Sequence, residues 1–285
     1  MSARKKLSII IPVCEMEGRL SNLKHTIMSF NDNRVEIVLV NDIKNDNTSR
    51  ELHDLAKNKE EIILIEGRYG NPGGARNAGL NVAKGDWIIF ADSDDVQHVS
   101  RIILDIDRLH DADVIIGNFE ICNEKTGKSA QYLTQNDFNR IALKPGIWRF
   151  VFKSNAIKGI RFPEISLGED QVYLSRIYFE KFQISYSTQL YYSYFVGNSN
   201  QLTSKKNNIR DLTIALFEII HQLHSRNSSF NQVLNAKLIL SIFKHGSIGQ
   251  KKVLIFYLIK NLRYLLISTY WLAYVCLRII TEHKK

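Results

Sequence analysis

Four short apolar segments, separated by stretches with helical spacing, divide the first hundred residues of the chain. They are Leu7–Val13, Val35–Val40, Ile62–Glu66 and Trp87–Ala91. Runs this short, apolar on both faces, are typical of the buried strands of a parallel sheet. Strands that alternate with helices at this spacing predict a doubly wound, mainly parallel α/β sheet. In such a sheet, ligands bind beyond the carboxyl ends of the strands.

A polar cluster directly follows three of these predicted strands. The clusters are Cys14–Glu17, Asn41-Asp42 and Asp92–Asp95. A polar turn is an ordinary way to end a buried strand, so a single cluster is weak evidence. Because the carboxyl ends of parallel strands share one edge of a sheet, the three clusters together predict one ligand-binding crevice.

The third cluster places three carboxylates within four residues. Such a group repels itself unless a cation or solvent compensates. Oxygen-only ligands suit Mg²⁺ or Mn²⁺, which keep bound water and share a diphosphate. The alternative is an acidic turn or a helix N-cap. The adjoining strand and the glycine-rich motif upstream favour a metal site at Asp92 and Asp94.

The glycine-rich motif runs from Asn71 to Gly79. Its glycines allow close backbone approach, and Arg76 offers a rigid fork of donors to phosphate oxygens. We expect the helix to begin at Ala78 and to end at Ala83. Alone, the motif would equally suit an ordinary loop-to-helix turn with a surface arginine.

Taken in order, four motifs resemble glycosyltransferase family 2 of the bacterial cell-surface polysaccharide type. They are LSIIIPV at Leu7–Val13, VLVND at 38–42, GARNAG at Gly74–Gly79 and GDWIIFADSDD at Gly85–Asp95. The later LGED at 167–170 resembles the motif that carries the family's catalytic base. The resemblance covers roughly residues 7–180 and implies a GT-A-like fold with a C-terminal helical appendage.

The resemblance implies a nucleotide-sugar donor and assigns binding residues to it. Pro12, Glu15 and Asp42 would line the nucleoside pocket. Arg76 and Ser93 would lie close to the nucleotide. The sequence departs from the family pattern at two places that concern recognition of the nucleobase. Cys14 stands where the family often has an aromatic residue, and Asn41-Asp42-Ile43-Lys44 stands where it often has Asp-Asp-Gly-Ser.

The resemblance also assigns the chemistry. Asp92 would lie near the ribose, and Asp94 would bind the Mn²⁺ or Mg²⁺ that bridges the diphosphate. Asp170 would be the base that deprotonates the acceptor, with Glu169 orienting the acceptor or substituting as base. Without the upstream motifs, this acidic pair would read as a helix cap. No spacing selects a third metal ligand among the histidines considered for it, His98, His221, His245 and His283.

The C-terminal part of the chain is basic and apolar. The chain has a net charge of +9, and from Lys237 onward nine Lys or Arg residues face one acid, Glu282. Tyr264–Leu277 carries no charge but is shorter than the ~20 residues that a membrane span needs. We predict a catalytic domain over residues 1–224 and a helical tail over residues 232–285. The tail would lie on an anionic membrane surface or, alternatively, would pack on the body or on a second copy in a homo-oligomer.

Three sparse cysteines fit a reducing cytoplasm, and the segment after Met1–Lys6 is too short for a signal peptide. We therefore expect a cytoplasmic protein at the inner face of the cell membrane. Since the basic residues are interleaved with apolar ones, we expect no nucleic-acid partner.

The sequence thus predicts an inverting, metal-dependent glycosyltransferase of cell-surface polysaccharide synthesis. Its donor would be a nucleotide-sugar, most simply a UDP-sugar, and its acceptor a saccharide or lipid-linked saccharide. A nucleotidyltransferase would need a basic glycine-rich loop near the N-terminus, whereas residues 13–17 are acidic. A non-catalytic nucleotide-sugar-binding scaffold at the membrane would have no need of Asp170.

Overall fold

The computed structural model describes residues 5–14, 20–42, 46–57, 59–134, 137–197, 209–225, 228–260 and 270–276. Glu15 and His283 lie outside these ranges. The chain forms two compact units. The first comprises Met1–Asn136, Gly146–Glu164 and Tyr178–Ser199, and the second comprises Asp137–Pro145, Ile165–Ile177 and Asn200–Lys285. The predicted division into a catalytic domain of residues 1–224 and a tail of residues 232–285 stays a prediction.

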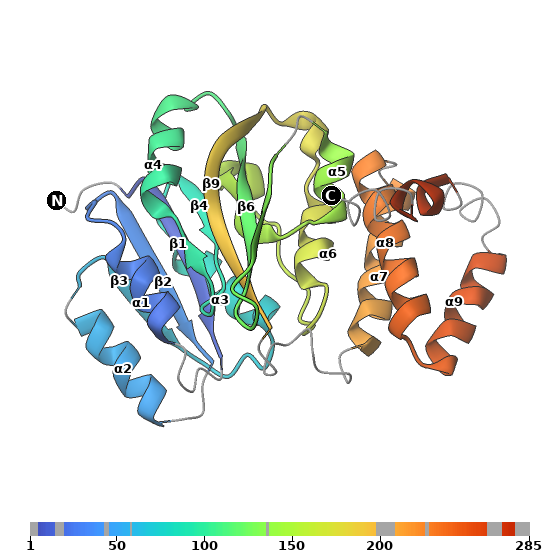
Figure 1. Cartoon of the computed structure of the whole chain (residues 1–285), viewed down its shortest axis with the longest axis horizontal. Helices are drawn as coiled ribbons and strands as arrows, with labels where there is room; N and C mark the ends of the chain where they lie inside the picture. The colour runs from blue at the N-terminus through green and yellow to red at the C-terminus, as the bar shows by residue number, and fades with distance from the viewer. Residues whose placement is uncertain are drawn as a thin grey trace. The chain divides into compact units, whose positions relative to one another are not determined.

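A nine-stranded mixed sheet forms the first unit (Figure 1). Its order is β3-β2-β1-β4-β8-β6-β9-β5, with β7 added on β6. The strands are β1 (Leu7–Val13), β2 (Val35–Asn41), β3 (Ile62–Glu66), β4 (Trp87–Phe90), β5 (Val96–Gln97), β6 (Val114–Asn123), β7 (Ser129–Tyr132), β8 (Phe150–Lys153) and β9 (Ile184–Val196). The first four are mutually parallel, as the apolar runs predicted, whereas β8 pairs antiparallel with both β4 and β6.

Helices cover both faces of this sheet. They are α1 (Leu20–Met28), α2 (Asp46–Lys57), α3 (Pro72–Val82) and α4 (Val99–Arg108). Short 3-10 turns at Ile147–Arg149 and Ser154–Ile157 flank β8, and one at Phe179–Lys181 precedes β9. Successive strand residues point to opposite faces. Ile9 and Ile11 therefore share a core with residues of α1, α2 and α4, whereas Ile10 contacts Gly79 of α3 on the other face. The predicted doubly wound α/β class is confirmed.

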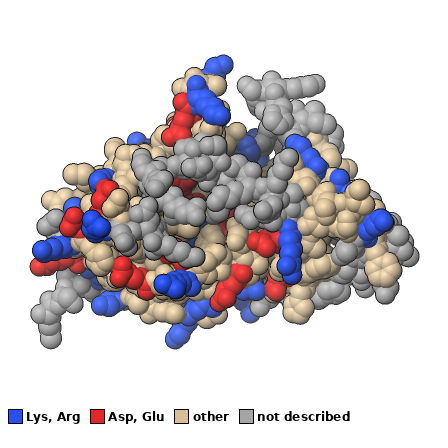
Figure 2. All heavy atoms as spheres, turned by 90° about the horizontal axis from the view of Figure 1, so that it is seen from below, with Lys and Arg blue, Asp and Glu red and all other residues tan. Residues whose placement is uncertain are grey.

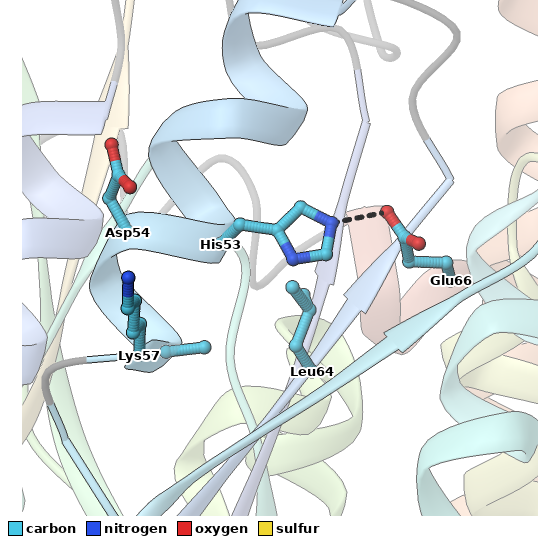
Figure 3. Close-up of a pocket in the computed structure, with 6 residues that line it drawn as sticks. His53, Asp54, Lys57, Leu64 and Glu66 are labelled. Carbon is cyan, nitrogen blue, oxygen red and sulfur yellow. Dashed lines mark hydrogen bonds and ion pairs between the residues drawn. The ribbon is translucent and has the colours of Figure 1, made fainter.

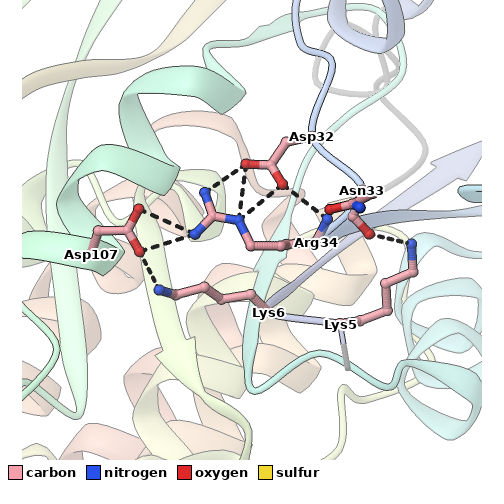
Figure 4. Close-up of polar contacts among 6 residues, drawn as sticks. All are labelled: Lys5, Lys6, Asp32, Asn33, Arg34 and Asp107. Atoms are coloured by element: carbon pink, nitrogen blue, oxygen red, sulfur yellow. Dashed lines mark hydrogen bonds and ion pairs between the residues drawn. The ribbon is translucent and has the colours of Figure 1, made fainter. Parts of the chain in front are cut away.

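Charged side chains gather at the amino ends of β1 and β2 (Figure 4). Arg34 pairs with Asp32 at 2.7 Å and with Asp107 at 3.3 Å, and Lys6 pairs with Asp107. A hydrogen bond from Arg34 lowers the pKa of Asp32, and one from Lys6 lowers the pKa of Asp107. These groups are substantially exposed, so each pair contributes little to stability. They lie at the edge of the sheet opposite to the carboxyl ends of its parallel strands.

The second unit is helical. Its helices are α5 (Phe138–Leu143), α6 (Glu169–Arg176), α7 (Ile209–Ser225), α8 (Ser229–His245) and α9 (Ile248–Lys260). The central helix is α8, which packs against the other four and buries residues on most of its sides. Asn231 of α8 donates to the Ser175 carbonyl of α6 (3.1 Å), and Arg176 pairs with Glu218 of α7 (2.9 Å).

The C-terminal helices expose apolar side chains. Ile248, Phe256 and Tyr270 are 76%, 61% and 68% exposed. Of the charge-free run Tyr264–Leu277, the described part is the helical turn at 270–276; the rest lies outside the described residues. Among the residues that the structure describes, no helix has both the length and the apolar character that a membrane span requires.

Candidate functional site

The acidic cluster forms a turn directly after β4. The turn is tied to the sheet by the amide of Ala91, which donates to the Ile10 carbonyl (3.0 Å). Ser93 and Asp95 are buried, at 6% and 2% exposed, whereas Asp92 and Asp94 are partly exposed. The two carboxylates predicted to hold a metal are therefore the two that solvent reaches.

The third carboxylate of the cluster has a different role. Asp95 accepts hydrogen bonds from the Tyr192 hydroxyl and from the Phe195 amide, both at 2.7 Å. Burial raises the pKa of Asp95 well above its usual range, and the charges of Asp94 and Asp92 raise it further. Asp95 therefore anchors the turn internally and faces β9 rather than solvent.

The structure pairs Arg76 with Asp92, a contact that the sequence analysis did not predict. The Arg76 Nη2 donates to Asp92 Oδ1 at 2.7 Å, and the Arg76 guanidinium lies 5.4 Å from the centre of the Phe162 ring. Arg76 is only 4% exposed. The alternative of a surface arginine is therefore wrong, and a buried guanidinium marks the junction of α3 and the acidic turn.

Helix α3 begins at Pro72, six residues before the predicted start at Ala78. The Asn71 side chain accepts a hydrogen bond from the Gly74 amide (2.7 Å) and caps the helix. Pro72 occupies the first turn, where a backbone N–H has no partner within the helix, so the missing N–H of proline costs nothing. The prediction of a loop was wrong because it weighed the glycines and not this cap. Arg76 is consequently held on a rigid helix.

The glycines of the motif let α3 pack closely against other parts of the same chain. A Cβ at Gly73 would lie 2.1 Å from the Pro163 carbonyl oxygen, and one at Gly79 would lie 2.4 Å from Ile10 Cγ2. Asn77 exchanges two hydrogen bonds with the backbone of Phe162 (2.8 and 3.0 Å). The motif thereby seats α3 on β1 and on the segment that carries Phe162.

Asp42, which follows β2, binds the backbone of the segment that leads into α3. Its two carboxylate oxygens accept from the Tyr69 and Gly70 amides, each at 2.7 Å, and Gly70 has a φ of 68°, which suits glycine. Each oxygen keeps a further lone pair for a ligand. Pro12 lies on β1 opposite Val40 and is partly exposed.

A pocket of about 600 Å³ lies beside β3 (Figure 3). It is lined by His53, Asp54, Ala56, Lys57, Leu64 and Glu66. His53 Nε2 lies 3.0 Å from Glu66 Oε1, which also accepts from the Asn41 side chain at 3.3 Å. None of the predicted catalytic or metal-binding residues lines this pocket, and we assign it no catalytic role.

Glu169 and Asp170 occupy the first turn of α6 in the second unit, where a helix N-terminus favours negative charge. The preceding Gly168 has a φ of 86°. Asp170 Oδ1 accepts from the adjacent Gln171 amide (2.7 Å). Burial lowers the pKa of Lys237 on α8 to about 8, and the charge of Asp170 opposes that shift. The predicted roles of this acidic pair stay predictions.

The carboxylates of the turn fit one kind of metal site. Over the described part of the chain, no three or more His, Cys, Asp and Glu side chains are grouped so as to hold a metal. Mg²⁺ and related ions are commonly bound by one or two carboxylates together with substrate phosphates and water. Asp92 and Asp94 therefore fit a cation shared with a diphosphate rather than one enclosed by protein.

Among the described histidines considered as a third metal ligand, none belongs to a group of three or more His, Cys, Asp and Glu side chains that could hold a metal. His98 Nε2 lies 2.9 Å from the Ser193 hydroxyl, and burial lowers the pKa of His98. His221 and His245 are exposed on α7 and α8 of the second unit.

Sequence reasoning missed Tyr192, whose hydroxyl contacts both ends of the acidic turn. The run Tyr191–Phe195 is rich in aromatic residues, which is typical of a strand and signals nothing more. Its partners are about a hundred residues away, so no local spacing could have signalled the contact.

Comparison with known proteins gives a consistent result. The model of glycosyl transferase family 2 matches residues 8–163. A poly(ribitol-phosphate) beta-glucosyltransferase from Bacillus spizizenii is 27% identical over 210 residues, which are 69% of this chain and 33% of that enzyme. The chain thus spans about a third of the length of that relative.

Solved structures share the fold. Staphylococcus aureus TarS 1-349 in complex with UDP-GlcNAc superposes with a TM-score of 0.63 at 20% identity, covering 84% of this chain and 73% of that one. The mannosyltransferase PcManGT from Pyrobaculum calidifontis, in complex with GDP-Man and Mn²⁺, gives a TM-score of 0.54 at 15% identity, covering 97% and 87%. The predicted GT-A-like fold is confirmed.

Proposed function

The chain belongs to glycosyl transferase family 2, and we propose that it moves a sugar from a nucleotide-sugar to a saccharide or lipid-linked saccharide acceptor in cell-surface polysaccharide synthesis. The observation that carries this proposal is the buried Arg76 paired with Asp92 beside the partly exposed Asp94, at the carboxyl end of β4. UDP-GlcNAc in TarS and the poly(ribitol-phosphate) acceptor named for the Bacillus relative support the donor and acceptor classes.

The first unit would bind the donor. Asp42 and Pro12 would border the nucleoside, as would Glu15, which lies outside the described residues, and Arg76 and Ser93 would lie near the nucleotide. Arg76 is already fixed by Asp92 and by α3, so little side-chain entropy is lost when an anion binds. Asp92 and Asp94 would hold Mn²⁺ or Mg²⁺, which would offset the charge that develops on the departing diphosphate.

By resemblance, the base would be Asp170. Asp170 would accept the proton of the acceptor hydroxyl as that oxygen attacks the anomeric carbon, and the nucleoside diphosphate would leave from the opposite side. A single displacement of this kind inverts the anomeric configuration. Glu169, 8% exposed, would orient the acceptor or substitute as base.

We further propose that the C-terminal helices bring the enzyme to the inner surface of the membrane. Exposed Ile248, Ile255 and Phe256 on α9 accompany Lys251 and Lys252. Apolar residues with basic neighbours suit an anionic lipid surface. On the face in Figure 2, red and blue side chains are intermixed over the left part, unlike the single-sign basic stripe of a nucleic-acid-binding protein.

Thermal-shift screening of UDP-sugars and GDP-sugars, with and without Mn²⁺, tests the proposal. A ligand at a hundred times its dissociation constant stabilises the folded state by about 2.7 kcal/mol. We expect one nucleotide-sugar to raise the melting temperature only with Mn²⁺, and to be slowly hydrolysed. Binding without metal-dependent release of the nucleotide would favour the scaffold instead. No stabilisation by any donor would contradict both.

A further inference from the structure

A single buried hydroxyl joins both ends of the acidic turn. The Tyr192 hydroxyl accepts from the Asp92 amide (3.1 Å) and donates to Asp95 Oδ2 (2.7 Å). Tyr192 is fully buried, so the hydroxyl has no water to replace either partner. The backbone of Asp92 is therefore fixed by a residue of β9, a hundred positions away in the chain.

The position of this hydroxyl is itself fixed. The Tyr192 ring stacks on Trp148 with centroids 4.3 Å apart and planes 7° apart, and Trp148 packs edge-on against Phe119 of β6. Tyr192 is also paired with Gln97 of β5 and Phe119 of β6 through the backbone. Because strand pairing and stacking hold the Tyr192 ring in place, the position of its hydroxyl is fixed.

The same strand holds the turn a second time. The Phe195 amide donates to Asp95 Oδ1 (2.7 Å), so both oxygens of Asp95 face β9. With Asp95 held inside, Asp94 remains partly exposed. The peptide that Tyr192 holds also carries the Asp92 side chain that accepts from Arg76.

We infer that Tyr192 is a positioning residue that fixes the Asp92–Asp95 turn for binding the diphosphate and its cation. The inference rests on the proposed function for the identity of the ligand, while the ordering of the turn can be measured without any ligand. Tyr192 would touch neither the donor nor the cation; it would act through Asp92 and Asp95.

The neighbouring tyrosine provides a matched control. Tyr191 is also fully buried, and its hydroxyl donates to a buried carboxylate, Asp105 Oδ2, at 2.8 Å. Asp105 belongs to α4 and not to the turn. Tyr191→Phe and Tyr192→Phe each remove one buried hydroxyl from a carboxylate, and Tyr192→Phe also removes the acceptor of the Asp92 amide. We therefore expect both variants to lose melting temperature, and Tyr192→Phe to lose more.

The test compares the full-length wild type, Tyr192→Phe and Tyr191→Phe by amide hydrogen exchange of peptides covering residues 91–97. We expect at least tenfold faster exchange in Tyr192→Phe and unchanged exchange in Tyr191→Phe, because only the first removes a contact of the turn. Calorimetry of UDP and GDP binding with Mn²⁺ should show about tenfold weaker affinity for Tyr192→Phe alone.

The outcomes separate the two claims. Unchanged exchange in Tyr192→Phe, or equal acceleration in both variants, would overturn the inference even if the wild type binds a nucleotide. Faster exchange restricted to Tyr192→Phe supports the positioning of the turn; if the wild type then binds neither UDP nor GDP with Mn²⁺, the proposed function and the ligand named in the inference both fail. Should Tyr192→Phe not fold, Trp148→Phe is the second variant, because it keeps the Tyr192 hydroxyl but weakens the stacking of the Tyr192 ring. We expect a smaller acceleration of exchange in the same peptides. If exchange in Trp148→Phe is not accelerated at all, the inference is overturned.

Discussion

The turn after β4 and the start of α6 each carry two acidic residues close together in the sequence, Asp92 and Asp94 in the turn and Glu169 and Asp170 in the helix, but they are built differently. The turn is held by contacts from distant residues: Arg76 to Asp92, Asn22 to the Asp94 carbonyl and Tyr192 to the Asp92 amide span 16, 72 and 100 positions. The acids of α6 follow a left-handed glycine, and Asp170 bonds to the next residue. A site that binds a highly charged diphosphate gains from rigid, preorganised partners.

This contrast leads to a division of effects. Substitutions in the turn or in its distant supports should change donor and metal binding. Substitutions at the start of α6 should change turnover and leave donor binding intact.

The largest expected effect is at Asp94. Asp94→Ala should abolish metal-dependent donor binding without unfolding the protein, because Asp94 is partly exposed and its removal relieves repulsion among three carboxylates. Calorimetric titration of the nucleotide with and without Mn²⁺ measures this. Asp111→Ala, an exposed acid outside the site, serves as the control. Unchanged affinity and unchanged Mn²⁺ dependence in Asp94→Ala would remove the metal assignment.

The next effect is on the base. Asp170→Asn should lower turnover by about 10²–10⁴-fold, the usual cost of losing a general base, with donor and metal affinity nearly intact. Steady-state kinetics of Asp170→Asn and Glu169→Gln, combined with donor binding, measures both. A larger loss of kcat in Glu169→Gln would transfer the role of base to Glu169. A loss of donor affinity in Asp170→Asn would break the division between the two regions.

A smaller effect is expected at the paired glycines of α3. A Cβ at Gly73 would lie 2.1 Å from the Pro163 carbonyl oxygen, whereas one at Gly74 would meet nothing closer than 3.4 Å. Gly73→Ala should therefore cost about 1–3 kcal/mol of stability and weaken donor binding. Gly74→Ala should be neutral or mildly stabilising, since alanine favours helix. Urea unfolding of the two variants decides this; equal stabilities would show that α3 shifts freely.

The smallest effect concerns Lys237, whose pKa is about 8 in the folded protein and about 10.5 when unfolded. Between these two pH values the unfolded chain binds more protons than the folded protein, so the free energy of unfolding should rise with pH. Below about pH 8 Lys237 is protonated in both states, and its destabilising contribution no longer changes with pH. Because Lys237 is partly exposed, we expect a rise on the order of 1 kcal/mol. Urea midpoints from pH 7.5 to 10 should show the rise in the wild type and a flatter profile in Lys237→Met. Parallel profiles would contradict it.

Much of the first unit could be predicted from the sequence, because its signals are local. The apolar runs of β1 to β4 and the polar residues after them predicted the parallel part of the sheet and the edge where Asp42 and Asp92 lie. The pairing of Arg76 with Asp92 was not predicted and became visible only in the structure.

The remainder depends on contacts that spacing cannot encode. Nothing in Asp92–Asp95 indicates that Asp95 turns inward, because its partners Tyr192 and Phe195 are on β9. Asp42 was predicted as a nucleoside ligand, but its bonds to the Tyr69 and Gly70 amides became visible only in the fold. The start of α3 was readable in principle, since Asn71-Pro72 is a recognised cap sequence.

The most direct measurement is the anomalous scattering of Mn²⁺ in crystals grown with the nucleoside diphosphate that the screen identifies. The account predicts a peak within about 2.1 Å of an Asp94 carboxylate oxygen, with the diphosphate on the other side of the ion and Arg76 beside it. A bound diphosphate with no peak at the turn, or a peak held by other residues, would contradict the central claim.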